Sequence, residues 1–307
     1  MGKQYPGTLL EFERWFRSEE ACREFVAKLR WPEGFRCPRC GHDKAWRTRR
    51  SLYHCSHCKR DISVTAGTIF QDSRLPLRVW FRAAWAITNQ KTGVNALGLQ
   101  RLIGLGSYRT AWSCLHKFRR AMTRSGRDLL SGSVEIDETY VGGVVHGTPS
   151  RRRGKICVLV AAEIRGTGIG RIRLQKIADD STISIKTGIR EVVAPGSLLV
   201  TDGSHAYKAL VPHGYSHNRT VLDGKGRQAS SAVLPRVHRI ASLLKRWLLG
   251  TYQGRVSGQQ IDHYLDEYTF RFNRRHSQQR GMLFYRLIQQ SVTTPPRPYK
   301  KLMAAAS

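Results

Sequence analysis

The chain has 307 residues, and its 52 lysines and arginines against 22 aspartates and glutamates give a formal net charge of +30. This excess of positive charge indicates a polyanionic partner, and nucleic acid is the most common one. A ribosomal-type protein or a membrane-surface binder fits less well, because the basic residues are spread through apparently folded segments. The hydrophobic content of 40% is enough to bury the cores of two or three domains.

The cysteines and the apolar runs indicate a reducing compartment. No apolar signal segment is visible at the N-terminus, and no run is long enough to span a membrane. Of the seven cysteines, Cys22, Cys114 and Cys157 lie in apolar patterns typical of buried free thiols, and the other four have metal-type spacing. A cytoplasmic location is therefore expected.

Residues 1–35 are predicted to be an N-terminal helical segment. Apolar side chains recur at helical spacing over residues 8–30, which indicates one or two short helices. Ser18 is placed to cap the second of them. Nothing in this segment requires chemistry, so it is interpreted as a packing module.

Two C-x-x-C pairs then predict a zinc ribbon over residues 36–70. Cys37 and Cys40 can chelate an ion from one tight turn, and Cys55 and Cys58 can close a tetrahedron from a second. Flanking runs at 52–54 and 61–64 have strand composition. Disulfides or chance spacing are the weaker alternative. The closed ligand set indicates structural zinc, and the surrounding arginines and lysines favour a ribbon that faces DNA.

Residues 71–125 form a helical unit that resembles a helix-turn-helix. Helices are predicted over 75–89, 94–103 and 107–122, with a Gly-Leu-Gly turn before the third. The candidate DNA-contacting residues are Tyr108, Arg109 and Thr110 at the start of the third helix, with Lys117 farther along its basic edge. An ordinary three-helix bundle is the equally weighted alternative.

From residue 132 the pattern changes to strands, and residues 132–292 are predicted to be one α+β or α/β catalytic domain. The expected order is strands at 134–142, 156–164 and 171–177, a helix at 181–193, a strand at 198–201, a helix at 204–210, a weak strand at 216–222, and helices at 236–249, 257–273 and 281–290. This order matches the ribonuclease-H-like fold. The Pro-rich, basic residues 293–307 are predicted to be disordered.

The first of these strands carries acids into an apolar setting. Glu135 and Asp137 share one face of the run VEIDETYVGG, and Glu138 points to the other face and is interpreted as structural. Buried carboxylates are unfavourable unless they are compensated. In a ribonuclease-H-like sheet, Asp137 lies beside Asp202 at the end of the fourth strand, and such a pair suits Mg²⁺ or Mn²⁺.

These residues resemble a known family, the DDE-type transposases of bacterial insertion sequences, in particular the ISXO-like group with a zinc ribbon in front. The resemblance covers nearly the whole chain and is carried by CPRC and CSHC, VEIDETYVGG, LLVTDGSHAY and the stretch beginning LPRVHRIASLLKRWLL. It implies cutting of double-stranded DNA at the element ends and joining of the 3′-hydroxyls to target DNA, with Asp137 and Asp202 as the family's aspartates. It also implies a homo-oligomer in the bacterial cytoplasm, associated with the nucleoid.

The chain departs from the family pattern at the third position. The family commonly has Glu seven residues before a basic residue; here Lys245 is the basic residue and His238 stands in the place of Glu. A neutral imidazole binds divalent ions but suits softer ones than Mg²⁺, so we expect Mn²⁺ to support cleavage better. If His238 instead marks lost activity, the chain is a catalytically inactive DNA-binding regulator. A third alternative is a nuclease that shares the fold but does not join strands.

Further basic residues are assigned to DNA on the ground of charge. Lys245 and Arg246 are interpreted as contacts to terminal phosphates. The remaining candidates are Arg151, Arg152 and Arg153 in the Gly-rich loop 142–155, and Arg271, Arg274 and Arg275 in the run FRFNRR.

Overall fold

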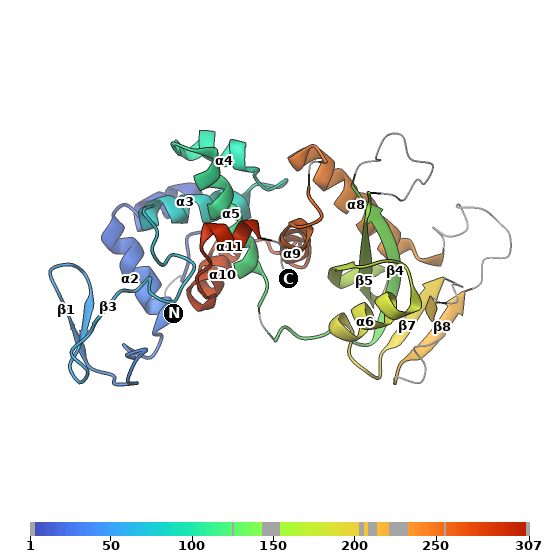
Figure 1. Cartoon of the computed structure of the whole chain (residues 1–307), viewed down its shortest axis with the longest axis horizontal. Coiled ribbons are helices and arrows are strands. Elements are labelled where there is room, and N and C mark those ends of the chain that lie inside the picture. Colours follow the sequence, from blue (N-terminus) through green and yellow to red (C-terminus); the bar gives the residue numbers. More distant parts are fainter. Residues whose placement is uncertain are drawn as a thin grey trace. The chain divides into compact units, whose positions relative to one another are not determined.

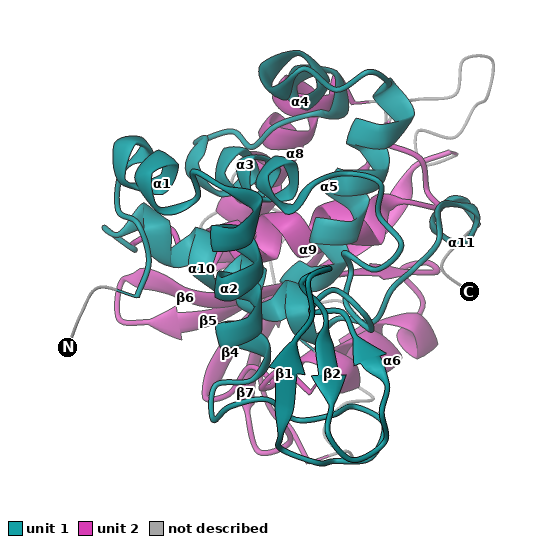
Figure 2. Cartoon of the chain, turned by 90° about the vertical axis from the view of Figure 1, so that its left-hand side faces the viewer, with its two compact units in different colours: residues 1–124, 277–305, 307 teal, residues 125–276, 306 magenta. Residues whose placement is uncertain are grey.

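The computed structural model describes residues 4–124, 126–142, 154–202, 206–207, 214–220, 233–254 and 256–304. The chain divides into two compact units, Met1–Arg124 with Ser277–Ala305 as unit 1, and Ser125–His276 as unit 2 (Figure 2). Helices and strands are mixed, as the sequence predicted. A search of the described helices finds none that is both long and apolar enough to cross a membrane.

Unit 1 combines helices with a small antiparallel ribbon (Figure 1). Its elements are α1 (Leu9–Trp15), α2 (Glu19–Arg30), β1 (Ala45–Arg47), β2 (Tyr53–Cys55), β3 (Asp61–Ile62), α3 (Leu77–Asn89), α4 (Ala96–Ile103), α5 (Tyr108–Met122), α10 (Arg280–Thr293) and α11 (Tyr299–Met303). Ser18 and Ser107 accept hydrogen bonds from the third backbone N–H that follows each of them, which confirms both as helix caps. Gly104 ends α4 at φ 68°, a conformation that favours glycine.

The core of unit 1 is aromatic, and part of it comes from the C-terminal end of the chain. The ring of Phe284 in α10 lies 5.4 Å from that of Phe12 and 5.6 Å from those of Phe16 and Phe81. The predicted boundary at residue 292 is therefore wrong for α10, which packs in unit 1. An amphipathic helix shows that it needs an apolar partner, but its sequence does not show which core provides one.

The predicted disorder of residues 293–307 is also wrong for part of that segment. Residues Tyr299–Met303 form α11, whose Leu302 is 1% exposed. The ring of Tyr299 lies 5.8 Å from that of Trp112 in α5. Proline-rich composition indicated disorder, but two apolar side chains are enough to hold this short helix on α5.

Unit 2 is a mixed five-stranded sheet with helices on both faces. Its elements are β4 (Ser133–Val141), β5 (Ile156–Arg165), β6 (Gly168–Ile177), α6 (Thr182–Val192), β7 (Leu198–Asp202), β8 (Ser216–Thr220), α8 (Pro235–Tyr252) and α9 (Ile261–Phe272). The strand order is β6-β5-β4-β7-β8, antiparallel from β6 to β4 and parallel from β4 to β8. Of the helix predicted at 204–210, only residues 206–207 are described.

Alternation along the strands separates two apolar layers. Val134 and Ile136 pack with α6, whereas Val158 and Val160 on β5 pack with α8 and α9. Glu135 and Asp137 share the second face, as the sequence predicted. Helix α8 therefore covers the face of β4 that carries Asp137.

Glu135 fixes the start of α8 on that face. Its side chain is 1% exposed and accepts hydrogen bonds from the backbone N–H groups of Arg236 (2.8 Å) and Val237 (3.1 Å). The Arg236 guanidinium adds a 2.7 Å salt bridge. The first N–H groups of a helix have no partner within the helix and favour negative charge, so the carboxylate serves as a cap supplied by another element. This contact lies immediately before His238.

Removing this cap should destabilise unit 2. We expect Glu135→Ala to lower the free energy of unfolding by about 1–3 kcal/mol, because the backbone N–H groups of Arg236 and Val237 lose their acceptor. Urea denaturation followed by circular dichroism measures the change. Glu191→Ala, at an exposed position in α6, is the matched control and should change stability by less than about 0.5 kcal/mol. Equal losses in the two variants would contradict the assignment.

Candidate functional site

The four predicted cysteine ligands come together in the ribbon of unit 1. Their sulfur atoms all lie within 4.8 Å of one another, with 3.7 Å between Cys37 and Cys58 and 3.6 Å between Cys40 and Cys55. Zinc–sulfur bonds of about 2.3 Å in a tetrahedron place the sulfurs about 3.8 Å apart, so the cluster fits a zinc ion. All four cysteines are free thiols rather than disulfide partners.

Two similar turns present these sulfurs. The N–H of Gly41 donates to the Cys37 carbonyl at 2.9 Å, and the N–H of Lys59 donates to the Cys55 carbonyl at 3.1 Å. Both closing residues have left-handed backbones, with φ 74° at Gly41 and 54° at Lys59. The non-glycine Lys59 is unfavourable in that region by about 1–2 kcal/mol, which a bound ion would offset.

In unit 2, strand register brings the two predicted aspartates to one level. β4 and β7 are parallel, with Glu135 opposite Val200. Two residues farther along each strand, Asp137 on β4 stands level with Asp202 at the end of β7. Both side chains fall on the face that α8 covers, because side chains alternate along a strand. Asp137 and Asp202 are far apart in the sequence, but the pairing of β4 with β7 brings them side by side.

The electrostatics of this pair suit a cation. Burial raises the pKa of Asp137 to about 6, and the nearby Asp202 charge adds to this rise against a hydrogen bond from the backbone. Two carboxylates that repel each other in a buried setting are stabilised when a divalent ion lies between them. The donor set fits Mg²⁺ or Mn²⁺ on chemical grounds.

His238 and Lys245 extend this site along α8. Nδ1 of His238 lies 3.8 Å from an Asp137 carboxylate oxygen. Lys245, on the same helical face, interacts electrostatically with Asp137. The structure thus groups the four predicted catalytic residues, but less tightly than the cysteines. Among the described residues, Asp137, Asp202 and His238 do not offer three donors that all lie within 4.8 Å of one another.

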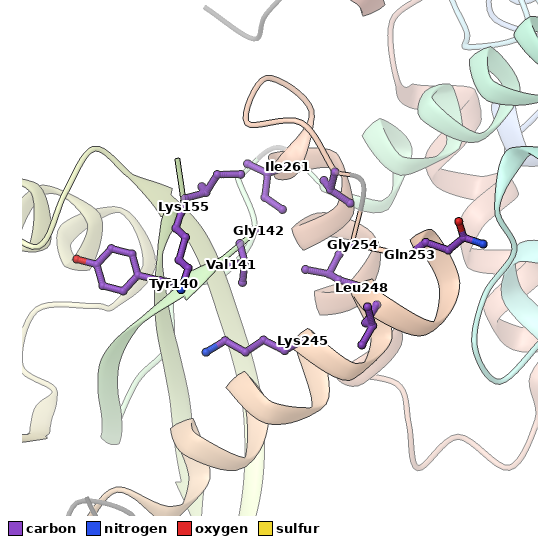
Figure 3. A pocket seen from close by; sticks show the side chains of 12 residues that line it. Tyr140, Val141, Gly142, Lys155, Lys245, Leu248, Gln253, Gly254 and Ile261 are labelled. Atoms are coloured by element: carbon purple, nitrogen blue, oxygen red, sulfur yellow. The ribbon is translucent and has the colours of Figure 1, made fainter. Parts of the chain in front are cut away.

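A cavity of about 620 Å³ opens beside Lys245 (Figure 3). Its walls are mostly apolar, with Ile156, Leu248 and Ile261 among them, and it carries two ammonium groups, those of Lys245 and Lys155. Partial desolvation lowers the pKa of Lys245, and the Lys155 charge contributes to this. Lys155 was not predicted as a site residue, although it stands at the end of the basic loop 142–155.

Glu138 and Tyr207 form a second contact near the aspartates. Glu138 lies on the opposite face of β4 from Asp137, and the Tyr207 hydroxyl donates a hydrogen bond to it. Burial raises the pKa of Glu138 to about 7, with the charges of Asp137 and Asp202 adding to the rise. Tyr207 is fully buried, so the pair ties the segment after β7 to β4.

The arginines predicted to face DNA in FRFNRR make contacts within the protein. The guanidinium of Arg274 lies 4.0 Å from the centre of the Phe270 ring and donates to the Phe270 carbonyl. Arg275 lies 4.1 Å from the centre of the Phe272 ring and donates to the carbonyls of Ile169 and Gly170. These contacts close the end of α9 against β6, which charge alone did not predict.

The remaining DNA candidates divide by exposure. Tyr108, which is 55% exposed, and Arg109 lie at the open start of α5, whereas Lys117 is half-buried over the Trp80 ring. Thr110 donates its backbone N–H to the capping Ser107. Arg246 is exposed on α8, and Arg271 is partly buried on α9. Arg151, Arg152 and Arg153 lie outside the described residues.

Known proteins match both parts of this arrangement. The family model of the ISXO2-like transposase domain matches residues 129–273, which lie within unit 2, and that of the transposase zinc-ribbon domain matches residues 17–61. An uncharacterized protein in transposable element ISH50 of Halobacterium salinarum is 31% identical over 278 residues, which cover 83% of this chain and 91% of that protein. The chain belongs to the ISXO2-like family of insertion-sequence transposases with a zinc-ribbon domain.

Proposed function

We propose that the chain is an active DNA transposase, which hydrolyses a phosphodiester bond at each element end and joins the freed 3′-hydroxyl to target DNA. The observation that carries the proposal is the register of β4 and β7, which sets Asp137 level with Asp202 under the helix of His238. The strand order β6-β5-β4-β7-β8 supports a ribonuclease-H-like core.

Asp137, Asp202 and His238 are the residues that would hold two divalent ions, Mg²⁺ or Mn²⁺. When bound, such ions activate the attacking oxygen and stabilise the leaving oxygen of an in-line displacement. The direct displacement requires no covalent link to the protein, so no serine or tyrosine nucleophile is assigned. The two strand backbones hold the aspartates, and the Glu135 cap on α8 holds His238 beside Asp137.

Lys245 and Lys155 supply the positive charge that orients the DNA strand. Both ammonium groups line the same cavity, and that of Lys245 interacts electrostatically with Asp137, so they can bind non-bridging phosphate oxygens next to the scissile bond. Arg246, one residue along an exposed turn of α8, extends this contact to the neighbouring phosphates.

Unit 1 would bind the element ends. We assign structural zinc to the ribbon over residues 36–70 and DNA recognition to the helix-turn-helix-like region over residues 71–125, with α5 as the reading helix. Because two ends must be cut and joined together, the working form is a homo-oligomer on double-stranded DNA, associated with the nucleoid.

Loss of either aspartate should abolish cleavage but preserve DNA binding. Asp137→Asn and Asp202→Asn are each expected to lower the cleavage rate at least about 100-fold, because each removes a charged metal ligand. The assay uses duplexes with the element's own ends and Mn²⁺, and it measures cut and joined products separately. Asp179→Asn, at an exposed position before α6, is the control.

The products of that assay separate the alternatives. Cleavage without joining would indicate a nuclease, and binding without cleavage by the unaltered chain would indicate a regulator. Cleavage that survives in both aspartate variants would overturn the site.

His238 should set the metal preference. The unaltered chain is expected to cleave faster with Mn²⁺ than with Mg²⁺, and His238→Glu should raise the ratio of Mg²⁺ to Mn²⁺ activity, because a carboxylate suits the harder ion. His276→Glu adds the same charge at an exposed position and should leave the ratio unchanged. An unaltered chain that is equally active or more active with Mg²⁺ contradicts this role.

The ribbon should contain one zinc ion per chain. Metal analysis of Cys55→Ser is expected to show loss of that ion together with the ribbon's fold, because ligand binding and folding of such small modules are coupled. Cys22→Ser changes a buried cysteine outside the cluster and should retain the metal. Zinc retained by Cys55→Ser would show that the cluster is not the site.

A further inference from the structure

Helix α11 lies beside α5 in unit 1, on the helix assigned to DNA recognition (Figure 1). The guanidinium of Arg109, in the first turn of α5, lies 3.9 Å from the centre of the Tyr299 ring. One α5 turn farther along, Trp112 meets the edge of the same ring. Arg120 donates to the Pro295 carbonyl at 3.5 Å, so the segment before α11 also follows α5. The C-terminal segment is thus built into this face of unit 1.

A groove of about 570 Å³ lies between α5, Tyr299 and the segment before α3. Its polar lining consists mainly of hydrogen-bond donors. The cations are Arg74, Arg109 and Lys117, the hydroxyls are those of Ser73, Thr110, Ser113 and Tyr299, and the carboxylate is that of Asp72. A lining of this kind offers many donors and one negative charge.

The cations of the groove outnumber its one carboxylate, that of Asp72, whose charge acts on Lys117. Within the described part of the chain, none of Arg74, Arg109 and Lys117 forms a salt bridge, although 22 acids are present in the sequence. Desolvation lowers the pKa of Lys117, whose ammonium stands 5.6 Å from the centre of the Trp80 ring. Asp72 can balance only one of the three charges, so positive charge remains in excess, and a bound anion would offset the cost of desolvating it.

We propose that this groove binds a backbone phosphate of DNA, and that α11 is therefore part of the DNA-binding surface. The inference rests on the proposed function, since it identifies where unit 1 holds the duplex. A phosphate accepts hydrogen bonds and does not donate them, which matches the donor-rich lining, whereas base edges present both donors and acceptors. The exposed Lys300 and Lys301 of α11 add charge beside the groove.

If the groove binds a phosphate, the residues of α5 have two different roles in DNA binding. Arg109 and Lys117 fix the register of the protein on the duplex by holding phosphates, which carry no sequence information. Tyr108, on the exposed start of the helix, is left to approach the bases. Arg109 remains a DNA-contacting residue, as the sequence suggested, with the role of positioning the duplex.

The test measures DNA binding without divalent ions, by fluorescence anisotropy over a range of salt concentrations. The probes are a duplex with the element's end and a duplex of unrelated sequence. Lys117→Met keeps the apolar stem over Trp80 and removes the charge. It should weaken binding to both duplexes alike and reduce the salt slope by about one. Lys28→Met, at an exposed position on α2, is the matched control and should behave like the unaltered chain.

Two further variants test the contributions of Arg109 in α5 and of helix α11. Arg109→Gln, at an exposed position in the first turn of α5, should reproduce the loss of one unit of salt slope, although it also removes the contact with the Tyr299 ring. A chain that ends at Thr294 removes Tyr299 and both lysines and should bind both duplexes more weakly. Circular dichroism and zinc content confirm that each variant is folded.

Specific outcomes overturn the inference. An unchanged salt slope in Lys117→Met and Arg109→Gln excludes a phosphate at the groove. A loss confined to the element-end duplex indicates base contacts instead. Tighter binding by the shortened chain shows that α11 covers the surface rather than contributes to it. The binding assay contains no divalent ions, so its result does not depend on cleavage. If the variants show the expected salt slopes but the unaltered chain never cleaves DNA in the Mn²⁺ assay, the proposed catalysis is refuted and the phosphate site in the groove still stands.

Discussion

The geometry of unit 2 depends on one buried contact, the Glu135 carboxylate under the first turn of α8. Strand register alone levels the two aspartates, but the residue that faces them comes from a helix that begins about a hundred residues later in the chain. A carboxylate that accepts two helix N–H groups and an arginine fixes both the position and the direction of that helix. The apolar side of α8 packs on the sheet, and the Glu135 contact fixes where along β4 the helix begins, and with it the place of His238.

The neighbouring acids of β4 therefore have different roles, set by their environments. Glu135 is neutralised by Arg236 and by helix N–H groups, and Glu138 receives a hydrogen bond from Tyr207 on the opposite face. Burial raises the pKa of Asp137, which lies between them, and the nearby carboxylate of Asp202 adds to that rise. A strand that satisfies its structural acids internally and leaves the middle one facing a like charge is well suited to attract a cation.

Local sequence signals predicted local structure well. The cysteine spacing, the serine caps at Ser18 and Ser107, and the positions of the strands along unit 2 each depend on residues close together in the chain, and the structure has all of them. Long-range partners were not predictable in the same way. The aromatic face of α10 does not show from its sequence that it packs against α3. The sequence around Phe270 likewise does not show that Arg274 packs on the Phe270 ring of its own helix. The contact between Glu135 and Arg236 was not predicted for the same reason, because the two residues lie far apart in the chain.

The return of the chain to unit 1 at Ser277 has a consequence for its synthesis. The core of unit 1 needs Phe284, which the ribosome adds only after all of unit 2. A growing or prematurely terminated chain consequently exposes the aromatic surface of α1 and α3 and lacks a finished DNA-binding unit. A chain that stops before Phe284 therefore leaves unit 1 without part of its core and less stable. The discontinuous core makes the folding of unit 1 depend on synthesis of the whole of unit 2.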